Sequence, residues 1–249
     1  MKLQEILSTS RILQILGDSN IEISSICFDS RKVSKGSLFV ALKGETSDGH
    51  DYIAQAVAAG AKAVICEILP EENISATIIQ VTDSHFTLGI VASNFYGRPS
   101  EKLKLIGITG TNGKTTTVTL LYRLFTDLGY KCGLLSTIVN YIAGKTIDAT
   151  HTTPDPVQIN ELLAQMTDTG CEFCFMEVSS HSLHQKRVAG LNFSGAIFSN
   201  ITRDHLDYHK NLEDYFAAKS RLFLEPGFTR PQTAAVINVN DSFGRRLAQ

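Results

Sequence analysis

The stretch GITGTNGKTTT, residues 107–117, constrains the fold more than any other part of the sequence. It follows an apolar run and precedes a run in which Val118, Leu121, Tyr122 and Phe125 recur at helical spacing. A glycine-rich turn between a strand and a helix is typical of phosphate-binding loops, because backbone N–H groups and the positive end of the helix converge there. The pattern here is G-x-x-G-K-T, two residues shorter than the common phosphate loop.

Four residues of this turn have a chemical role if it binds phosphate. Gly110 and Gly113 allow a tight backbone path, Lys114 can reach the terminal phosphates, and the Thr115 hydroxyl can ligate Mg²⁺. A simple tight turn between strand and helix would explain the glycines, but not a lysine followed by three threonines. We therefore predict a nucleotide-binding loop.

The remaining pattern predicts an α/β fold in two domains. Residues 1–98 alternate short strand and helix signals, with strands expected at 24–33, 36–42, 63–67 and 77–81, and the stretch YGRPSEKLK (96–104) marks a boundary. Residues 99–249 repeat longer strand–helix units, which favours a mostly parallel sheet covered on both faces. The sequence stops within a predicted helix that follows Asp241, so we expect this second domain to be truncated and a C-terminal domain to be absent.

Composition restricts the partners. The chain has 249 residues, 43% of them hydrophobic, a net charge of −2 and no block of like charges, which argues against nucleic acid or an anionic membrane as a partner. No signal peptide and no apolar run long enough for a membrane span is present, so we expect a cytoplasmic protein. The five cysteines are odd in number and scattered, which indicates reduced thiols. Cys171 and Cys174 form a C-x-x-C that is typical of core packing, although a redox pair or half a zinc site is the alternative.

Three strand ends in the second domain carry polar residues, and ligands gather at the carboxyl ends of parallel strands. These ends lie near Thr137, at 177–180 and at 200–209. Glu177 is placed to hold Mg²⁺, or else is a buried, hydrogen-bonded glutamate. The segment RDHLDYH contains a dense set of candidate ligands, which would bind a metal or form a structural network: Asp204, His205, Asp207 and His209.

Lys219 lies in the middle of the apolar stripe of a predicted helix, with Leu212, Tyr215, Phe216, Leu222 and Phe223. Such a lysine commonly extends its amine to solvent. Alternatively, a desolvated amine has a lowered pKa and can react as a nucleophile. If it took up CO₂, the resulting carbamate would be an anion able to ligate Mg²⁺.

Taken together, the motifs resemble those of the Mur ligases. The resemblance covers essentially the whole chain and rests on TGTNGKTT (109–116), HTTPD (151–155), MEVSSHSL (176–183), SNITRDHLDYH (199–209) and YFAAKSRLF (215–223), in that order. The stretch 28–53 is similar to the uridine-binding module of the family members that add a diamino acid. The resemblance implies an ATP-dependent, cytoplasmic amide ligase of peptidoglycan synthesis, which we expect to be a monomer.

The implied reaction activates the D-Glu γ-carboxylate of UDP-MurNAc-L-Ala-D-Glu with ATP as an acyl phosphate, which the amine of a diamino acid then displaces. The resemblance implies that Gly110, Thr111, Asn112, Gly113, Lys114, Thr115 and Thr116 bind ATP. It implies Mg²⁺ at Thr115 and Glu177, and a second Mg²⁺ at His205 and carbamylated Lys219. The residues that it implies for the UDP substrate are Phe28, Ser30, Glu45, Thr46, Ser47, His151, Thr152, Thr153, Ser179, Gln185 and Arg187. His151 stands where the family pattern has asparagine.

Two alternatives stay open at the level of sequence. One is a sister ligase with another acceptor, such as a different muramoyl peptide, and the other is a nucleotide-binding regulatory module without ligase activity. Because the family's third domain supplies much of the amino-acid pocket, we expect the present chain alone to bind nucleotide or UDP substrate without turnover. The identity of the diamino acid is not given by the sequence.

Overall fold

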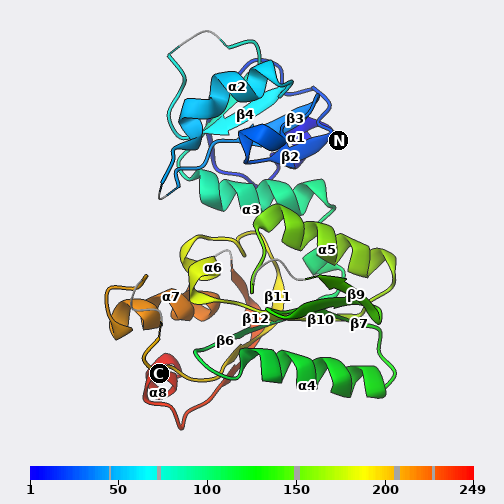
Figure 1. Ribbon diagram of the computed structural model, residues 1–249, viewed down its shortest axis with the longest axis vertical. Helices are drawn as coiled ribbons and strands as arrows, with labels where there is room; N and C mark the ends of the chain where they lie inside the picture. Colours follow the sequence, from blue (N-terminus) through cyan, green and yellow to red (C-terminus); the bar gives the residue numbers. More distant parts are fainter. Residues whose placement is uncertain (45, 72–73, 149–151, 205–207, 226–227) are drawn as a thin grey trace. The chain divides into compact units, whose positions relative to one another are not determined.

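The structure is a computed structural model that describes residues 1–44, 46–71, 74–148, 152–204, 208–225 and 228–249. The chain forms two compact units, Met1–Gly97 and Arg98–Gln249. This division lies one residue before the boundary expected from the sequence. Figure 1 labels the elements of both units.

The first unit is built on a five-stranded sheet in the order β1-β5-β4-β3-β2. Strands β2 to β5 run parallel to their neighbours, whereas β1 pairs antiparallel with β5 at the edge. Its strands are β1 (Ile12–Leu16), β2 (Ser25–Cys27), β3 (Ser37–Val40), β4 (Ala63–Cys66) and β5 (Thr77–Val81). Its helices are α1 (Leu3–Ile6), η1 (Ser30–Lys32), η2 (Gly49–Tyr52), α2 (Ile53–Ala58) and α3 (Ser84–Phe95).

One expected strand of this unit is shorter than the sequence pattern indicated. The strand predicted at 24–33 ends at Cys27, and a 3-10 turn follows it. The cause is Asp29, whose side chain accepts a hydrogen bond from the backbone N–H of Arg31 and so bends the chain out of the sheet. Phe39, Ile53, Val64 and other apolar side chains form the core between the sheet and α2.

The second unit is built on a seven-stranded sheet in the order β12-β11-β6-β10-β7-β8-β9. The five strands from β12 to β7 are parallel, as the strand–helix alternation predicted, and β8 and β9 add an antiparallel hairpin at one edge. The strands are β6 (Lys104–Thr109), β7 (Cys132–Leu135), β8 (Val139–Ile142), β9 (Lys145–Asp148), β10 (Phe173–Glu177), β11 (Phe193–Phe198) and β12 (Thr229–Ile237).

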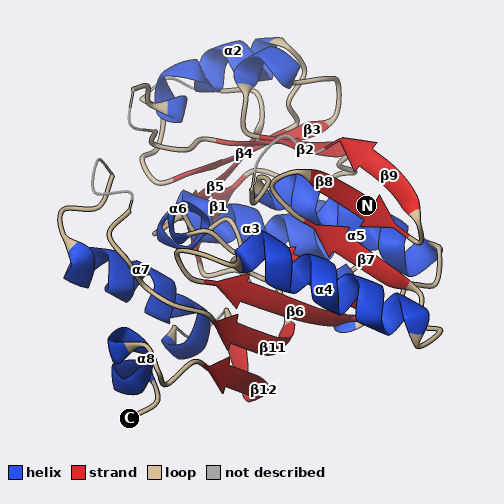
Figure 2. Ribbon diagram, turned by 60° about the horizontal axis from the view of Figure 1, so that its bottom comes forward, coloured by secondary structure: helices blue, strands red, loops and turns tan. Residues whose placement is uncertain are grey.

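Helices cover both faces of this second sheet, with α4 on one face and α5 on the other (Figures 1 and 2). Asp155 caps α5 by accepting hydrogen bonds from two backbone N–H groups, and Pro156 occupies the first turn, as the sequence predicted. Asn211 caps α7 in the same way. The helical elements are η3 (Pro99–Glu101), α4 (Lys114–Asp127), α5 (Pro156–Asp168), α6 (Ser180–His184), α7 (Leu212–Leu224) and α8 (Ser242–Leu247).

The predicted apolar stripe of α4 packs against the sheet. Val118 is fully buried, and Leu121, Tyr122 and Phe125 surround it against residues of β6, β7 and β10. Cys171 and Cys174 are buried free thiols beneath the same sheet, which confirms the core-packing interpretation over a redox pair. Burial raises the pKa of the Cys174 thiol well above its ordinary value, so this sulfur is protonated and unreactive.

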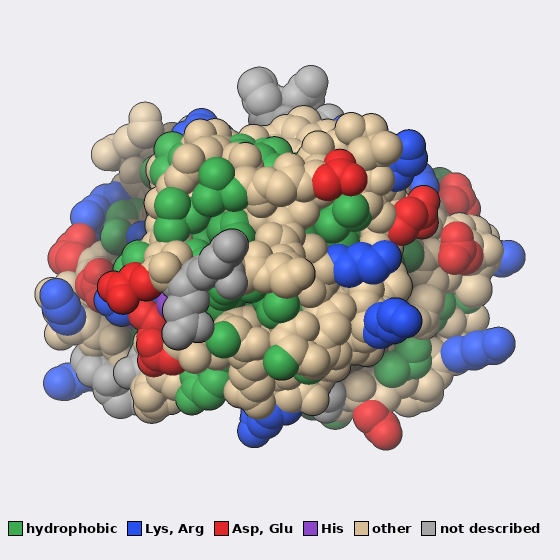
Figure 3. All heavy atoms as spheres, turned by 90° about the horizontal axis from the view of Figure 1, so that it is seen from above, with side chains coloured by type: hydrophobic (Ala, Val, Ile, Leu, Met, Phe, Trp, Pro, Cys, Tyr) green, Lys and Arg blue, Asp and Glu red, His purple; other side chains and the backbone are tan. Residues whose placement is uncertain are grey.

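The distribution of charge on the surface agrees with the low net charge of the sequence. On the face drawn in Figure 3, acidic and basic side chains are interspersed rather than gathered by sign. Within the described ranges, no helix combines the length and the apolar character that crossing a bilayer requires.

Candidate functional site

The site is built where three parallel strands end side by side. Strand β10 lies between β6 and β7, and the register pairs Glu177 with Ile108 and Met176 with Leu135. The carboxyl ends of β6, β10 and β7 therefore lie at one edge of the sheet, where ligands bind in open α/β folds. The predicted phosphate loop follows β6. Glu177 is the last residue of β10, and Thr137 comes two residues after the end of β7.

The loop between β6 and α4 depends on two glycines with positive φ. Gly110 has φ 147° and Gly113 has φ 85°, and Gly113 is the N-cap of α4. As a glycine, this N-cap has no side chain to accept from the N–H groups of the first turn, which leaves them able to bind a ligand. A Cβ at position 110 would collide with the Ser199 hydroxyl and lie 3.0 Å from the backbone N and O of Asn200.

Two loop residues are oriented differently from the sequence-based expectation. The backbone N–H of Thr111 donates to the Asn200 carbonyl at 2.8 Å, and that of Asn112 donates to Asn200 Oδ1 at 3.0 Å. In this conformation these two N–H groups bond the loop to the segment after β11. They are therefore not directed at a ligand at the start of α4. Thr116 is exposed on α4 and is not among the residues that line the cavity described below.

Two lysine amines meet at one backbone oxygen of the loop. Lys114 Nζ donates to the carbonyl of Gly110 at 2.9 Å and to that of Thr111 at 2.9 Å. Lys219 Nζ, from α7, donates to the same Gly110 carbonyl at 2.8 Å. Burial lowers the pKa of Lys114, while the charges of Glu177 and Asp204 oppose that shift.

Lys219 does not extend its amine to solvent, so the first of the two interpretations of its position is wrong. The residue is 1% exposed and its amine lies 4.4 Å from the centre of the Tyr215 ring, one helical turn earlier on α7. Burial, and next the charge of Lys114, hold the pKa of Lys219 well below its ordinary value. A lowered pKa increases the share of neutral amine at a given pH, and the neutral amine is the form that reacts as a nucleophile.

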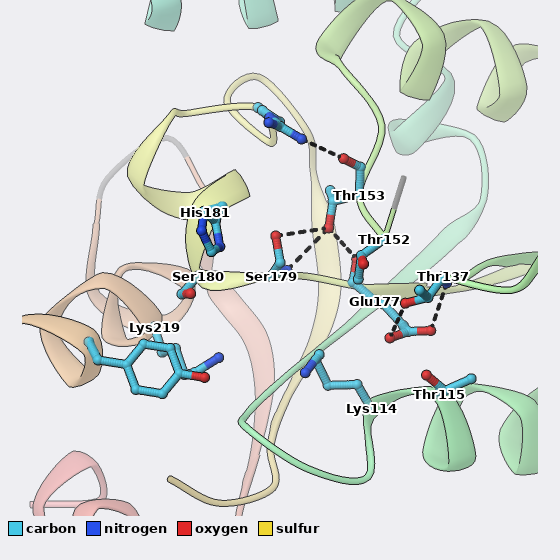
Figure 4. A pocket seen from close by; sticks show the side chains of 12 residues that line it. Lys114, Thr115, Thr137, Thr152, Thr153, Glu177, Ser179, Ser180, His181 and Lys219 are labelled. Carbon is cyan, nitrogen blue, oxygen red and sulfur yellow. Dashed lines mark hydrogen bonds between the residues drawn. The ribbon is translucent and has the colours of Figure 1, made fainter. Parts of the chain in front are cut away.

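Glu177 is also buried, and one residue holds both of its carboxylate oxygens. The glutamate is 1% exposed. The backbone N–H of Thr137 donates to Oε1 at 3.0 Å, and the Thr137 hydroxyl donates to Oε2 at 3.2 Å (Figure 4). Each carboxylate oxygen keeps lone pairs for a further partner.

The opposite wall is formed by Thr153, Ser179 and Arg187. Thr153 Oγ1 donates to the Glu177 carbonyl at 2.9 Å and accepts from the Ser179 N–H at 3.1 Å, which ties the wall to β10. Arg187 donates to the Thr153 carbonyl at 2.9 Å, and its Nε and Nη2 donate to Gln185 Oε1 at 2.9 and 2.6 Å. Gln185 thus orients the guanidinium and does not itself line the cavity.

These elements surround a cavity of about 390 Å³. Figure 4 shows side chains from α4, α6, α7 and the ends of β7 and β10 pointing into it. The cavity is lined by Lys114, Thr115, Thr137, Thr152, Thr153, Glu177, Ser179, Ser180, His181, Arg187, Tyr215 and Lys219. Eight of these were predicted from sequence as site residues: Lys114, Thr115, Thr152, Thr153, Glu177, Ser179, Arg187 and Lys219.

The charges of the cavity suit anionic ligands and a hard cation. Two lysines and an arginine, Lys114, Lys219 and Arg187, line it, and Glu177 is the one carboxylate among the described lining residues. The Thr115 hydroxyl and the Glu177 carboxylate are the oxygen ligands that Mg²⁺ prefers, so the residues present fit this metal. Among the described residues, no group of three or more histidine, cysteine, aspartate or glutamate side chains forms a separate metal site.

Several predicted site residues are not part of this geometry. Glu45, His151, His205 and Asp207 lie outside the described residues. Phe28, Ser30, Thr46 and Ser47 belong to the first unit, where Phe28 follows β2 and Ser30 begins η1, and their contact with uridine stays a prediction. His209 is buried on the side of α7 near Asp214, with its Nδ1 3.6 Å from that carboxylate, and does not line the cavity.

The sequence-based list missed four residues that line the cavity, Thr137, Ser180, His181 and Tyr215, of which Thr137 was named only as a polar strand end. Ser180 and His181 directly follow Ser179 in the same motif, so adjacency at a strand end was an available signal. Tyr215 was assigned to the apolar stripe of α7, but its position four residues before Lys219 places it beside that amine.

The fold and the cavity define an α/β protein with a glycine–lysine loop of the phosphate-binding type at the carboxyl edge of a parallel sheet. Residues 108–249 match the model of the Mur ligase middle domain, and residues 22–96 match that of the Mur ligase family catalytic domain. The chain belongs to the Mur ligase family.

Named relatives and solved structures agree with this assignment. The chain is 54% identical over 251 residues to the UDP-N-acetylmuramoyl-L-alanyl-D-glutamate–2,6-diaminopimelate ligase of Cytophaga hutchinsonii, covering 100% of this chain and 51% of the relative. It is 49% identical over 251 residues to the enzyme of the same name from Bacteroides thetaiotaomicron, with the same coverage. A solved structure of a ligase of that name matches with a TM-score of 0.80 at 28% identity, over 100% of this chain and 49% of that one. The chain therefore spans about half the length of the curated relatives it matches.

Proposed function

We propose that this chain is the part of an ATP-dependent ligase that binds ATP, Mg²⁺ and a UDP-linked muramoyl peptide. The reaction joins the D-Glu γ-carboxylate of UDP-MurNAc-L-Ala-D-Glu to an amine of 2,6-diaminopimelate. The choice of diaminopimelate rests on the names of the relatives that are about half identical to this chain. Because the reaction consumes ATP, we place it in the cytoplasm, and we propose that the protein acts as a monomer.

One observation carries this proposal: two lysines, one arginine and one glutamate from different elements, all among the described residues, converge on a single cavity at the sheet edge. The reaction requires a substrate carboxylate to approach the terminal phosphate of ATP, and these two anions repel each other. Lys114 and Arg187 offset that repulsion and hold both groups at reacting distance. Positioning and charge neutralisation are the main contributions a protein makes to phosphoryl transfer.

The steps follow from this arrangement. The substrate γ-carboxylate attacks the γ-phosphorus of ATP, and the bond from that phosphorus to the ADP oxygen breaks. The amine of the diamino acid then attacks the acyl carbon, phosphate leaves with the bonding electrons, and the nitrogen loses a proton. Lys114 and the first turn of α4 bind the transferring phosphate, and Arg187, oriented by Gln185, binds an anionic group of the muramoyl substrate.

We propose Thr115 and Glu177 as the residues that hold Mg²⁺, which supplies charge neutralisation at the phosphates when bound. We further propose that Lys219 carries a carbamate in the working enzyme and that this carbamate and His205 hold a second Mg²⁺. In support, the Lys219 amine is desolvated beside Lys114, a setting that favours the neutral amine needed to take up CO₂.

The test is a product assay on the complete protein that contains this chain. ATP, Mg²⁺ and UDP-MurNAc-L-Ala-D-Glu are supplied with meso-diaminopimelate, L-lysine or no amine, and the UDP-linked products are identified by mass. We expect the diaminopimelate adduct together with stoichiometric ADP and phosphate. Formation of the lysine adduct in its place would reassign the amine substrate.

A regulatory module without ligase activity is the competing function from another class. It would bind nucleotide and give no amide product with any amine in the same assay. A sister ligase with a different muramoyl acceptor would give no product from UDP-MurNAc-L-Ala-D-Glu but would form one from a longer or shorter peptide precursor.

A further inference from the structure

Three hydroxyl side chains stand on the wall of the cavity formed by the end of β10 and the start of α6, and two of them are engaged with the protein itself. Thr153 Oγ1 donates to the Glu177 carbonyl and accepts from the Ser179 N–H. Ser179 Oγ caps α6 by accepting from the Ser182 N–H at 3.1 Å. The third hydroxyl belongs to Ser180.

Ser180 differs from its neighbours because its hydroxyl has no hydrogen-bond partner within the part of the chain that the structure describes. The residue is 1% exposed and its side chain lines the cavity, between Ser179 and the lysine of α7 (Figure 4). A buried hydroxyl without a partner is unfavourable, and such groups are few in native proteins, so one that lines a cavity calls for an explanation. Rotation about χ1 moves this oxygen between staggered positions without any movement of the backbone.

The surrounding charges indicate what the hydroxyl binds. The described side chains of the same cavity include the cations of Lys114 and Arg187, which outnumber the carboxylate of Glu177, so an anionic occupant is favoured. A serine hydroxyl has one donor, and a phosphate or carboxylate oxygen is its strongest acceptor. Neutral acceptors are disfavoured here because they would leave Lys114 and Arg187 with less negative charge than positive charge around them.

We propose that Ser180 is a substrate-binding residue whose hydroxyl donates a hydrogen bond to an anionic oxygen held in the cavity. The oxygen belongs either to the terminal phosphate of the nucleotide or to the carboxylate that attacks it, since both must enter the space between the lysines. This inference rests on the proposed function and assigns a ligand contact to a residue that motif comparison passed over in favour of Ser179. Because Ser179 Oγ already caps a helix, Ser180 supplies the hydroxyl that is free to bind the ligand.

The experiment compares Ser180→Ala with Ser182→Ala in this chain. Ser182 is the matched control, since it is a fully buried serine of the same helix whose hydroxyl donates to the Ser179 carbonyl at 2.7 Å and does not line the cavity. Each variant is melted without ligand and titrated by calorimetry with two probes. One is a non-hydrolysable ATP analogue with Mg²⁺, and the other is UDP-MurNAc-L-Ala-D-Glu.

We expect the two variants to behave in opposite ways. Ser180→Ala keeps or raises the melting temperature, because no hydrogen bond within the protein is lost, but it weakens one probe about 10-fold or more, as loss of a bond to a charged group does. Ser182→Ala melts at a lower temperature and binds both probes as the wild type does. The probe that weakens identifies the anion, phosphate or carboxylate.

Two results would overturn the inference. Wild-type affinity of Ser180→Ala for both probes would show that the hydroxyl does not touch the ligand. A drop in melting temperature like that of Ser182→Ala would show that it has a partner in the protein. If the wild type itself bound neither probe, the proposed function would fail as well, and the wild-type titration separates that case from failure at Ser180 alone.

Discussion

The hydrogen bonds between Thr137 and Glu177 allow a quantitative prediction about the metal-binding carboxylate. Thr137→Val keeps the backbone N–H donor at 3.0 Å and removes the hydroxyl donor at 3.2 Å. Hydrogen bonds to charged groups contribute about 1.5–3 kcal/mol. Thr137 is exposed on its outer side, so water replaces part of the lost bond and we expect a loss of about 1.5 kcal/mol in the free energy of unfolding.

For a unit of this size that loss lowers the melting temperature by about 3–6 °C. The assay is thermal unfolding of the wild type, Thr137→Val and Thr137→Ser, the last of which keeps the hydroxyl and should melt close to the wild type. A double-mutant cycle tests the role of charge, because in a Glu177→Gln background the bond is neutral and Thr137→Val should cost roughly half as much. Equal melting of Thr137→Val and Thr137→Ser, or an undiminished cost in the Glu177→Gln background, would refute the reasoning.

Three further predictions concern the loop and its lysines. Lys114→Ala removes the cation of the first turn of α4 and should abolish binding of the ATP analogue, as measured by calorimetry. Retained affinity would refute the assignment of residues 110–116 as a phosphate-binding loop. Gly110→Ala should lower the free energy of unfolding in urea by more than about 2 kcal/mol, because φ is 147° and the new Cβ meets Ser199 and Asn200. In Gly113→Ala no described atom lies within 4 Å of the new Cβ, so the variant should lose only about 1 kcal/mol for its φ of 85°. Equal costs would show that contact with the 199–200 segment does not matter. Because the pKa of Lys219 is lowered on folding, the unfolded chain binds more protons between the folded-state pKa and the ordinary lysine pKa, so the free energy of unfolding rises with pH in that window. Lys219→Met should flatten this rise below the ordinary lysine pKa, and an unchanged slope would contradict the lowered pKa.

The sequence predicted those features that depend on neighbours along the chain. Periodicity identified the buried face of α4, and Asp155 with Pro156 identified the start of α5, because caps and stripes act within a few residues. The hairpin β8–β9 was missed, since its strands are four residues each and only β8 alternates regularly, between half-buried and buried positions. Short edge strands depend on the strand they pair with more than on their own pattern.

Lys219 and the loop amides, whose orientation the sequence did not decide, have partners far away along the chain. Whether Lys219 extends to solvent or turns inward depends on the Gly110 carbonyl, 109 residues away along the chain. The orientation of the Thr111 and Asn112 amides depends on Asn200, which no local pattern connects to the loop. Local motifs therefore identified which residues matter, while their hydrogen bonds required the tertiary structure.

The position of β6 in the sheet affects how this site forms. Both neighbours of β6, β10 and β11, come from residues 173–198, long after the loop in sequence, and the loop amides bond to residue 200. Contacts so distant in sequence close large loops and form slowly during folding. On an emerging polypeptide, Lys114 would leave the ribosome well before the residues that orient it, so competence to bind nucleotide should arise abruptly once about 200 residues are available.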